Sequence, residues 1–495
     1  MRPNWTDATE ELTPRALVSR LGEWTAGDGP LYKRLAERLQ LGIERGELPA
    51  GARLPPERLL ARALAVSRTT VVGAYDMLRA HGALESRQGS GTWVTVPPPG
   101  EEPPRHAPAP PRQTSLRGFI SAPPGSIDLL GAHLPGVPGV FQAALASSQK
   151  ELQELTSIPG YHPLGLASLR KAVAQFLTRS GLPTREDQLL MTTGAQQAIS
   201  LSAAAFLQPG DTVVVEDPTY VGAIDAFRSA GARVVSVPVG PDGVSPAMLR
   251  ETVVRSSARL VYLMPTFQNP TGTVMPETRR RDVARLAEEL QVPVLEDNTL
   301  GDIVLTATPP PPIGAFTSEG TVLSVGSMSK LFWAGLRVGW IRAGETVLAR
   351  LIHQKVVADM GSSVPSQCLA AHVLAHSEKV KRVRRKEVGA TLDLFTEMIG
   401  KHLPGWSFSR PTGGLVLWVK MPHGDAAEVA QVALRHGVSI VPGSLLSPEG
   451  GWADHVRFPL VTGEAIVREG IERLGRAWKS YTTGARRTRE MGVIV

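Results

Sequence analysis

One short stretch, residues 327–339, combines residue types that could do covalent chemistry: a lysine, two serines and an arginine. It follows the apolar run 322–325, so it is predicted as a strand that runs into a loop. The amine of Lys330 would form a Schiff base with an aldehyde, while Ser327 and Arg337 would donate charge-assisted hydrogen bonds to phosphate oxygens. The cofactor that carries both groups is pyridoxal phosphate. Taken alone, a loop lysine is usually just solvated.

A second stretch, residues 193–197, offers further phosphate ligands. It reads Thr-Gly-Ala-Gln-Gln, follows a predicted strand and opens a predicted helix. The backbone amides of Ala195 and Gln196 would therefore lie at a helix N-terminus, where phosphate binds readily. As an isolated turn, this stretch would be ordinary.

Three more positions suit the ring of the same cofactor. Tyr220 offers an aromatic face for stacking, and the amide of Asn269 can donate to a ring phenolate oxygen. Asp297 ends a predicted strand and would pair with the pyridinium nitrogen, which keeps the ring an electron sink. Each has an ordinary alternative: a packed tyrosine, an Asn-Pro turn and a strand-end acid. Their shared order and spacing with Lys330 favour the cofactor site.

The elements that must position these residues alternate between strands and helices. Predicted strands lie at residues 188–192, 212–215, 233–237, 260–264, 292–295 and 321–324, with helical patterns such as 279–290 between several of them. Such alternation predicts an α/β sheet with binding residues at the strand ends. Residues 413–419, 426–436 and 438–441 predict a smaller α+β subdomain.

Residues 126–480 resemble the class I aminotransferases of fold type I. The resemblance implies that Lys330 is the Schiff-base lysine and Asp297 the pyridinium partner. The other roles that it implies fall to Asn269 (O3′ donor), Tyr220 (ring stacking), Ala195, Gln196, Ser327 and Arg337 (phosphate), Tyr161 (phosphate of the neighbouring subunit) and Arg457 (substrate or effector carboxylate). For Arg457 a structural salt bridge is the alternative.

Two positions depart from that pattern. The family commonly has a tyrosine two or three residues after the aspartate, where this chain has Thr299 and no tyrosine. A proline that is usual four residues after the lysine is Ala334. We expect both changes to leave cofactor binding intact and to affect the efficiency of proton transfer in the site.

The N-terminal part of the chain predicts a winged helix. Apolar residues repeat at helical spacing within 29–46, 56–64 and 67–82, and Ser67 is a good N-cap for the third helix. Two short strands around a Gly-rich tip follow at 84–94. The motifs Leu-Pro-x-Glu-Arg, Val-Ser-Arg-Thr-Thr-Val and Ser-Arg-x-Gly-Ser-Gly-Thr resemble the DNA-binding domain of GntR-type transcription regulators.

This resemblance assigns DNA contacts to three places. Side chains at the N-terminus of a recognition helix reach base edges, here Ser67, Arg68, Thr69 and Thr70. Arg58 and the wing residues Arg87, Gln88 and Gly89 would hold the DNA backbone or the minor groove. The alternative for the arginines is a surface salt bridge. The family's usual Pro-Ser is Pro55-Pro56 here, which alters the cap of the second helix.

Composition divides the chain into five segments. Residues 1–26 are an arm or short helix, 27–96 the winged helix, 97–125 a proline-rich linker, 126–480 the aminotransferase-like domain and 481–495 a basic tail. The linker is predicted to be extended and semi-rigid. A basic run at 379–386 is either a solvated helix face or a surface that faces phosphates.

Charge and cysteine content narrow the class of protein. A net charge of +7 and a pI near 9.6 permit contact with a polyanion without proving it. The single cysteine, Cys368, excludes a disulfide framework within the chain. No long apolar run and no secretory signal are visible. We therefore expect a cytoplasmic protein.

Together the parts resemble the MocR (GabR-like) family of regulators. That resemblance implies a homodimer, often head-to-tail, that binds a double-stranded DNA operator and senses pyridoxal phosphate or an amino compound. Two alternatives are open. One is a catalytically active aminotransferase with an appended winged helix, and the other is a cofactor-free dimerisation scaffold.

Overall fold

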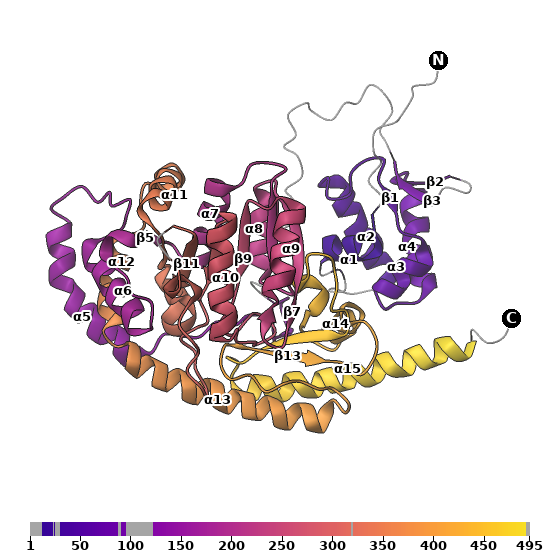
Figure 1. Ribbon diagram of the computed structural model, residues 1–495. Helices are drawn as coiled ribbons and strands as arrows, with labels where there is room; N and C mark the ends of the chain where they lie inside the picture. Colours follow the sequence, from indigo (N-terminus) through magenta and orange to yellow (C-terminus); the bar gives the residue numbers. More distant parts are fainter. Residues whose placement is uncertain are drawn as a thin grey trace, which may run out of the picture. The chain divides into compact units, whose positions relative to one another are not determined.

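The computed structural model describes residues 12–22, 24, 30–87, 91–95, 122–317 and 320–491. The chain forms two compact units (Figure 1). The first unit comprises the chain up to Asp128, residues 424–439 and the chain from Arg473 onward. The second unit comprises residues 129–423 and 440–472. Among the described residues, no helix is both long and apolar enough to cross a membrane.

The N-terminal part of the first unit is a winged helix. Its helices are α1 (Pro14–Leu21), α2 (Leu31–Glu44), α3 (Glu57–Ala63) and α4 (Arg68–Ala80). Its antiparallel sheet has the order β1 (Arg53–Leu54), β3 (Gly91–Val94), β2 (Leu84–Arg87). The last three helices and the two wing strands confirm the sequence prediction, including Ser67 as the N-cap of α4.

Apolar residues at helical spacing build the core of this domain. Leu35, Leu39, Leu60 and Val71 are fully buried and belong to one cluster. Leu17 of α1 is in the same cluster. The segment predicted as an arm or short helix therefore contains a helix that contributes to the core of the DNA-binding domain.

An eight-stranded sheet forms the centre of the second unit. Its order is β5 (Leu189–Thr192), β12 (Gly339–Arg342), β11 (Val322–Ser327), β10 (Val294–Asp297), β9 (Leu260–Leu263), β6 (Thr212–Asp217), β7 (Arg233–Gly240), β8 (Gly243–Val244). Strands β11, β10, β9, β6 and β7 are parallel to one another, and β12 is antiparallel to both β11 and β5. The six strands predicted from sequence are present, and the prediction missed β12 and the two-residue strand β8.

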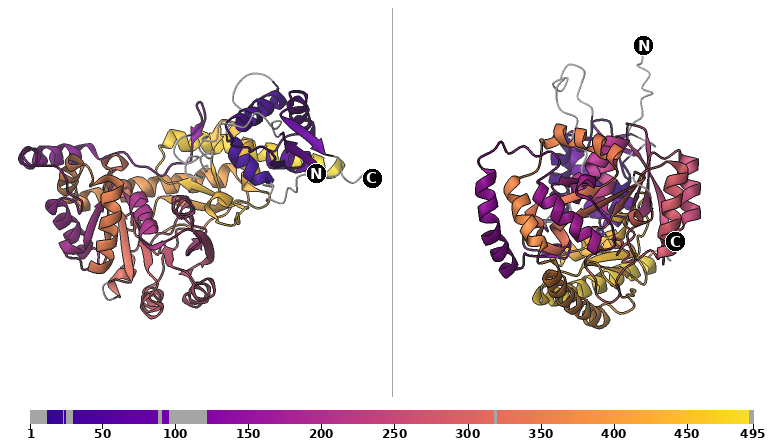
Figure 2. Two further views of the ribbon diagram at one scale, coloured as in Figure 1. Left: turned by 90° about the horizontal axis from the view of Figure 1, so that it is seen from above. Right: turned by 60° about the vertical axis from the view of Figure 1, so that its left-hand side comes forward.

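Helices cover this sheet, and most of its strands are buried, as expected of the interior of a parallel sheet. Strand β7, next to the edge, is partly exposed. Figures 1 and 2 show α9 (Pro246–Ser256) beside α10 (Glu277–Leu290), in agreement with their contacts. Helix α7 (Ala195–Phe206) packs on α8 (Val221–Ser229) and on α11 (Glu345–Asp359).

A smaller sheet in the second unit has the order β13 (Val416–Lys420), β16 (His455–Pro459), β15 (Val441–Pro442). The long helix α13 (Ser377–His402) belongs to the same unit. In the first unit, β14 (Val438–Ser439) pairs with β4 (Ile127–Asp128). Helix α15 (Glu464–Met491) continues through residue 480, where the sequence predicted the start of a tail.

Candidate functional site

The predicted site residues gather at the carboxyl ends of neighbouring strands. Asp297 is the last residue of β10 and Ser327 the last of β11, and these strands pair in parallel. Tyr220 follows the end of β6 and caps α8. Because parallel strands end at one edge of the sheet, residues far apart in sequence meet there.

Lys330 lies in a short π-helical turn, Ser329–Trp333, where the sequence predicted a loop. Its Nζ donates a hydrogen bond to the carbonyl oxygen of Ala132 at 2.8 Å. Burial and then the charge of Arg457 lower the pKa of Lys330, against the opposing charge of Asp297, to about 8. A lysine with such a pKa holds a substantial neutral fraction near pH 8 and is a competent nucleophile.

Asp297 is buried and accepts two hydrogen bonds. Tyr262 Oη donates to its Oδ2 at 2.9 Å, and the amide of Thr299 donates to its Oδ1 at 2.9 Å. Burial raises the pKa of the Asp297 carboxyl, while Thr299, Tyr262 and Lys330 lower it. Sequence reasoning missed Tyr262; the signal was a tyrosine in the buried strand that pairs with the strand of Asp297.

The start of α7 and the turn before β12 form the predicted phosphate site. Gly194 caps α7 with a φ of 127°, and the first amides of the helix, which include Ala195 and Gln196, need partners from outside it. A Cβ at Gly194 would lie 3.4 Å from the Arg337 guanidinium, and a Cβ at Gly339 would lie 2.7 Å from Gly194 Cα. Glycine at both positions thus lets arginine and helix terminus approach each other.

A cavity of about 500 Å³ lies along α7 and α11, and Thr193, Gln196 and Arg337 are among the residues that line it. Ser327 is buried and does not line this cavity; its Oγ donates to Ser329 Oγ at 3.0 Å and lies 3.4 Å from the carbonyl oxygen of Val338, the residue after Arg337. The cavity, the helix terminus and the arginine together suit a phosphate group.

Tyr220 and Asn269, the residues predicted to contact the ring of the cofactor, are partly buried and buried, respectively. Tyr220 Oη donates to Gln196 Oε1 at 3.1 Å, and burial raises the pKa of Tyr220 to about 12. The Oδ1 atom of Asn269 is buried and has no hydrogen-bond partner among the described residues. This unsatisfied oxygen can accept a hydrogen bond from a ligand, whereas the predicted contact with a ring oxygen would use the Nδ2 group of the same amide.

Arg457 is buried in β16 and donates to the carbonyl oxygen of Leu130. Burial lowers the pKa of Arg457 to about 10, and the nearby Tyr220 raises it. The same arginine shifts the pKa of Lys330, so the structure brings both cations together. Tyr161, by contrast, is 69% exposed and is not brought into this site.

The basic run at 379–386 lies in α13, and one of its members corrects the prediction of a solvated face. Arg384 is 1% exposed and donates to the carbonyl oxygens of Leu331 and Phe332, the two residues after Lys330. A third bond goes to the carbonyl oxygen of Pro135. Arg384 therefore joins α13 to the turn that carries Lys330.

In the winged helix, the predicted DNA-contacting side chains lie at the N-terminus of α4. Ser67 Oγ accepts from the amide of Thr70 at 3.2 Å, and Arg68 and Thr69 are exposed. Arg58 on α3 is exposed too. Arg87 ends strand β2, and Gln88 and Gly89 lie outside the described residues.

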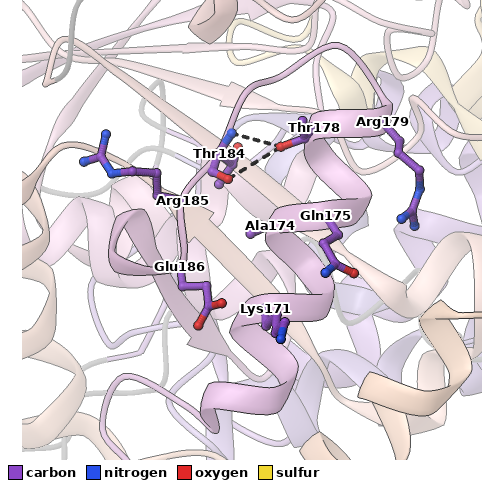
Figure 3. A pocket seen from close by; sticks show the side chains of 8 residues that line it. All are labelled: Lys171, Ala174, Gln175, Thr178, Arg179, Thr184, Arg185 and Glu186. Carbon is purple, nitrogen blue, oxygen red and sulfur yellow. Dashed lines mark hydrogen bonds between the residues drawn. The ribbon is translucent and has the colours of Figure 1, made fainter.

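A pocket between α6 (Ala167–Arg179) and residues 184–186 lies away from these residues (Figure 3). The amide of Thr184 donates to Thr178 Oγ1 at 3.1 Å at its rim. None of the predicted site residues lines it, so we assign it no part in the site.

Two family descriptions match the chain. Residues 130–474 match the model for class I and II aminotransferases, and residues 31–94 match the model for bacterial regulatory proteins of the gntR family. The first match spans the second unit's sheet and Arg457; the second spans the winged helix.

Known proteins of two kinds are similar to the chain. The Bacillus subtilis HTH-type transcriptional regulator YdfD is 29% identical, over 90% of this chain and 96% of its own. The probable rhizopine catabolism regulatory protein MocR of Rhizobium meliloti is 30% identical, over 84% and 87%. The solved structure of LysN, an α-aminoadipate aminotransferase of Thermus thermophilus complexed with N-(5′-phosphopyridoxyl)-L-leucine, has a TM-score of 0.68 and 29% identity, over 75% and 96%.

Proposed function

The chain belongs to the class I and II aminotransferase family and is a gntR-type regulator of the MocR group, and on this premise we propose that it controls transcription by sensing an amino compound in its aminotransferase-like unit. The observation that carries the proposal is the pairing of an exposed recognition-helix terminus with a buried lysine site in one chain. DNA binding follows from the gntR domain and would take place in the cytoplasm.

Pyridoxal phosphate is the cofactor that this family implies, and the residues present fit it. When bound, it supplies an aldehyde that condenses with amines and a ring that withdraws electrons. Lys330 provides the amine for attachment and Asp297 a carboxylate for the ring nitrogen. Arg337 and the first amides of α7 would hold the phosphate, with Ser327 beside them.

The chain's own residues divide the remaining work. Tyr220 lies against Gln196 and would cover one ring face, and Asn269 would meet a polar edge of the ring. Arg457 would take the carboxylate of an amino acid effector by a bidentate pair. Tyr262 keeps the Asp297 carboxylate oriented and lowers its pKa.

Two cationic side chains of the site donate hydrogen bonds to the segment that follows the linker. Lys330 donates to the carbonyl of Ala132, and Arg457 donates to the carbonyl of Leu130. Both carbonyls belong to the segment that follows the linker in the chain. When Lys330 and Arg457 engage ligands, they exchange these bonds, and the segment changes its hold on the site.

We further propose a homodimer in which Tyr161 completes the partner's phosphate site. Tyr161 and Ile158 are exposed, as are Val357 and Met360 at the end of α11. The two segments are neighbours, since a Cβ at Gly361 would lie 2.9 Å from the carbonyl oxygen of His162. An exposed apolar set of this kind is typical of an interface.

Subunit complementation tests this dimer. Lys330→Ala and Tyr161→Ala chains each lack one half of the site, and a mixed dimer regains one complete site if Tyr161 acts across the interface. Cofactor absorbance should return to about a quarter of the wild-type value on mixing, because random assortment makes about half of the dimers mixed and each of these has one intact site of two. If mixing restores none, Tyr161 does not act in the partner.

The regulatory function is tested with the full-length protein on genomic DNA. Footprints collected with and without candidate amino acids should differ in strength or spacing at particular sites. The Lys330→Ala variant should abolish this difference between the footprints while it still binds DNA. Equal footprints with every amine, or no preference over competitor DNA, would contradict the proposal.

A second function, catalytic transamination, is supported by the presence of Lys330, Asp297 and Arg457 together. Steady-state assays with amino donors and keto acids distinguish the two. Repeated turnover would favour an enzyme with an appended winged helix, whereas a single half-reaction fits a sensor.

A further inference from the structure

Three metal-ligating side chains of different types converge between two helices outside the lysine site. Glu151 lies on α5 (Pro138–Leu155), and Cys368 and His372 lie on α12 (Val364–Leu374). One ligand atom from each lies within 4.8 Å of both others. His372 Nε2 is 3.1 Å from Glu151 Oε2, so two of the three already meet.

The spacing of these residues explains the convergence. Cys368 and His372 are four residues apart and share one face of α12. That face packs on α5, one of the closest helix pairs in the second unit. The convergence is therefore fixed by two well-packed helices rather than by a loop.

The donor set is the one that zinc prefers. Thiolate, imidazole and carboxylate are its usual ligands, and three protein ligands leave a fourth position for water or another ligand. In a tetrahedral site ligand atoms lie roughly 3.5 Å apart, so the widest separation here must close by about 1 Å. Side-chain rotation of Glu151 and His372, which are 28% and 32% exposed, can supply this movement.

The burial of the three donors suits an open metal site. Cys368 is fully buried, and its Sγ contacts the carbonyl oxygen of Ser148 at 3.5 Å. Glu151 and His372 are partly exposed and form the outer side, through which an ion can enter. The alternative is a purely structural network in which Glu151 and His372 join the two helices.

We propose that Glu151, Cys368 and His372 bind one divalent zinc-class cation per chain. Binding displaces the proton of the Cys368 thiol to solvent and forms a metal–sulfur bond, with no change in oxidation state. The fourth position holds water. This site is separate from the cofactor residues, so it stands or falls independently of the proposed regulatory function.

X-ray absorption on the full-length holoprotein tests the proposal directly. The protein is stripped with a chelator, loaded with one equivalent of Zn²⁺ and compared with the Cys368→Ser variant. One sulfur neighbour at about 2.3 Å and nitrogen or oxygen neighbours at about 2.0–2.2 Å are expected. Because Cys368 is the only cysteine of the chain, a sulfur neighbour at thiolate distance identifies it.

Calorimetric titration with Zn²⁺ supplies the second measurement. The wild type should bind one equivalent, and His372→Gln and Glu151→Gln should each weaken binding at least about tenfold. His353→Gln, an exposed histidine on α11, is the matched control and should bind as the wild type does. A wild-type spectrum without sulfur, or equal affinity in all variants, overturns the proposal and leaves the structural network.

Discussion

The winged helix and the aminotransferase-like unit arrange their functional side chains in opposite ways. In the winged helix, Arg68 and Thr69 are adjacent in sequence and exposed at one helix terminus. In the other unit, Asp297 and Arg457 are 160 residues apart and almost fully buried. The exposed arrangement suits contact with a large partner such as DNA. The second uses burial to change the chemistry of groups that enclose a small one.

The largest effect that separates the two regions is the pH dependence of Lys330. Its pKa is lowered to about 8, so the neutral amine is about one tenth of the total at pH 7, against about one in three thousand for an ordinary lysine. The rate of cofactor attachment to cofactor-free protein should rise about fiftyfold from pH 6 to pH 8 and level off about twofold higher at more alkaline pH. Stopped-flow absorbance measures it.

The direction of this pH dependence follows from the protonation state of the lysine that reacts. Only the neutral amine attacks an aldehyde, so lowering the pKa extends reactivity to lower pH. A rate that climbs without a plateau to pH 10 would mean that the burial of Lys330 does not perturb it. DNA affinity measured over the same range of pH serves as the control.

The next effect belongs to the exposed region. Arg68→Ala should weaken operator binding by about 1–3 kcal/mol, since a bidentate contact to a base is worth that much. Binding to competitor DNA should fall less, and the cofactor absorbance should be unchanged. Fluorescence anisotropy at fixed salt measures both affinities. Equal loss on both kinds of DNA would make Arg68 a phosphate contact instead.

A smaller effect is expected inside the buried region at Tyr262. Tyr262→Phe removes the hydrogen bond to Asp297 and raises the pKa of that carboxyl, because this bond lowers it. Cofactor affinity should fall about tenfold, as the loss of a hydrogen bond to a charged group costs about 1.5 kcal/mol. Equilibrium dialysis measures it, and Tyr481→Phe, whose hydroxyl bonds Glu428, is the matched control. Unchanged affinity would show that Thr299 suffices to hold Asp297.

The smallest effect concerns the cap of the recognition helix. Ser67→Ala removes the acceptor for the Thr70 amide and should destabilise the winged helix by about 1 kcal/mol. Urea unfolding followed by a probe in that domain measures it. Unfolding of the other unit should not change, and a shift there would show that the two do not unfold separately.

Much of the fold could be predicted because local pattern and final structure agree. Ser67 before an apolar repeat predicts the start of α4, and apolar runs predict the parallel strands. Strand β12 was not predicted, because it follows the lysine turn directly and belongs to the same glycine-containing stretch. The helix at residues 14–21 was ambiguous, since only its packing on the other helices shows why Leu17 is apolar.

The site could be predicted only where residue type carries the chemistry. Lys330, Asp297 and Arg337 stand in recognisable stretches, and the structure gathers the first two near Arg457. Tyr262 and Arg384 act through contacts between distant segments. Arg384 lies in a run of charges that looks solvated, and its burial depends on carbonyls more than fifty residues away in the chain. No local pattern contains that information.

In the proposed regulator, the hydrogen bonds from Lys330 and Arg457 to residues 132 and 130 would couple the affinity for ligand to the conformation of this segment, and the coupling is reciprocal. A change that strengthens the hydrogen bonds between the site and this segment must weaken the binding of ligand by the same free energy. Substitutions at Leu129 or Gly131, the neighbours of Leu130 in the chain, would then change the concentration of amine at which the protein responds. Sensitivity could thus evolve in the backbone beside the linker while the chemistry of the pocket stays constant.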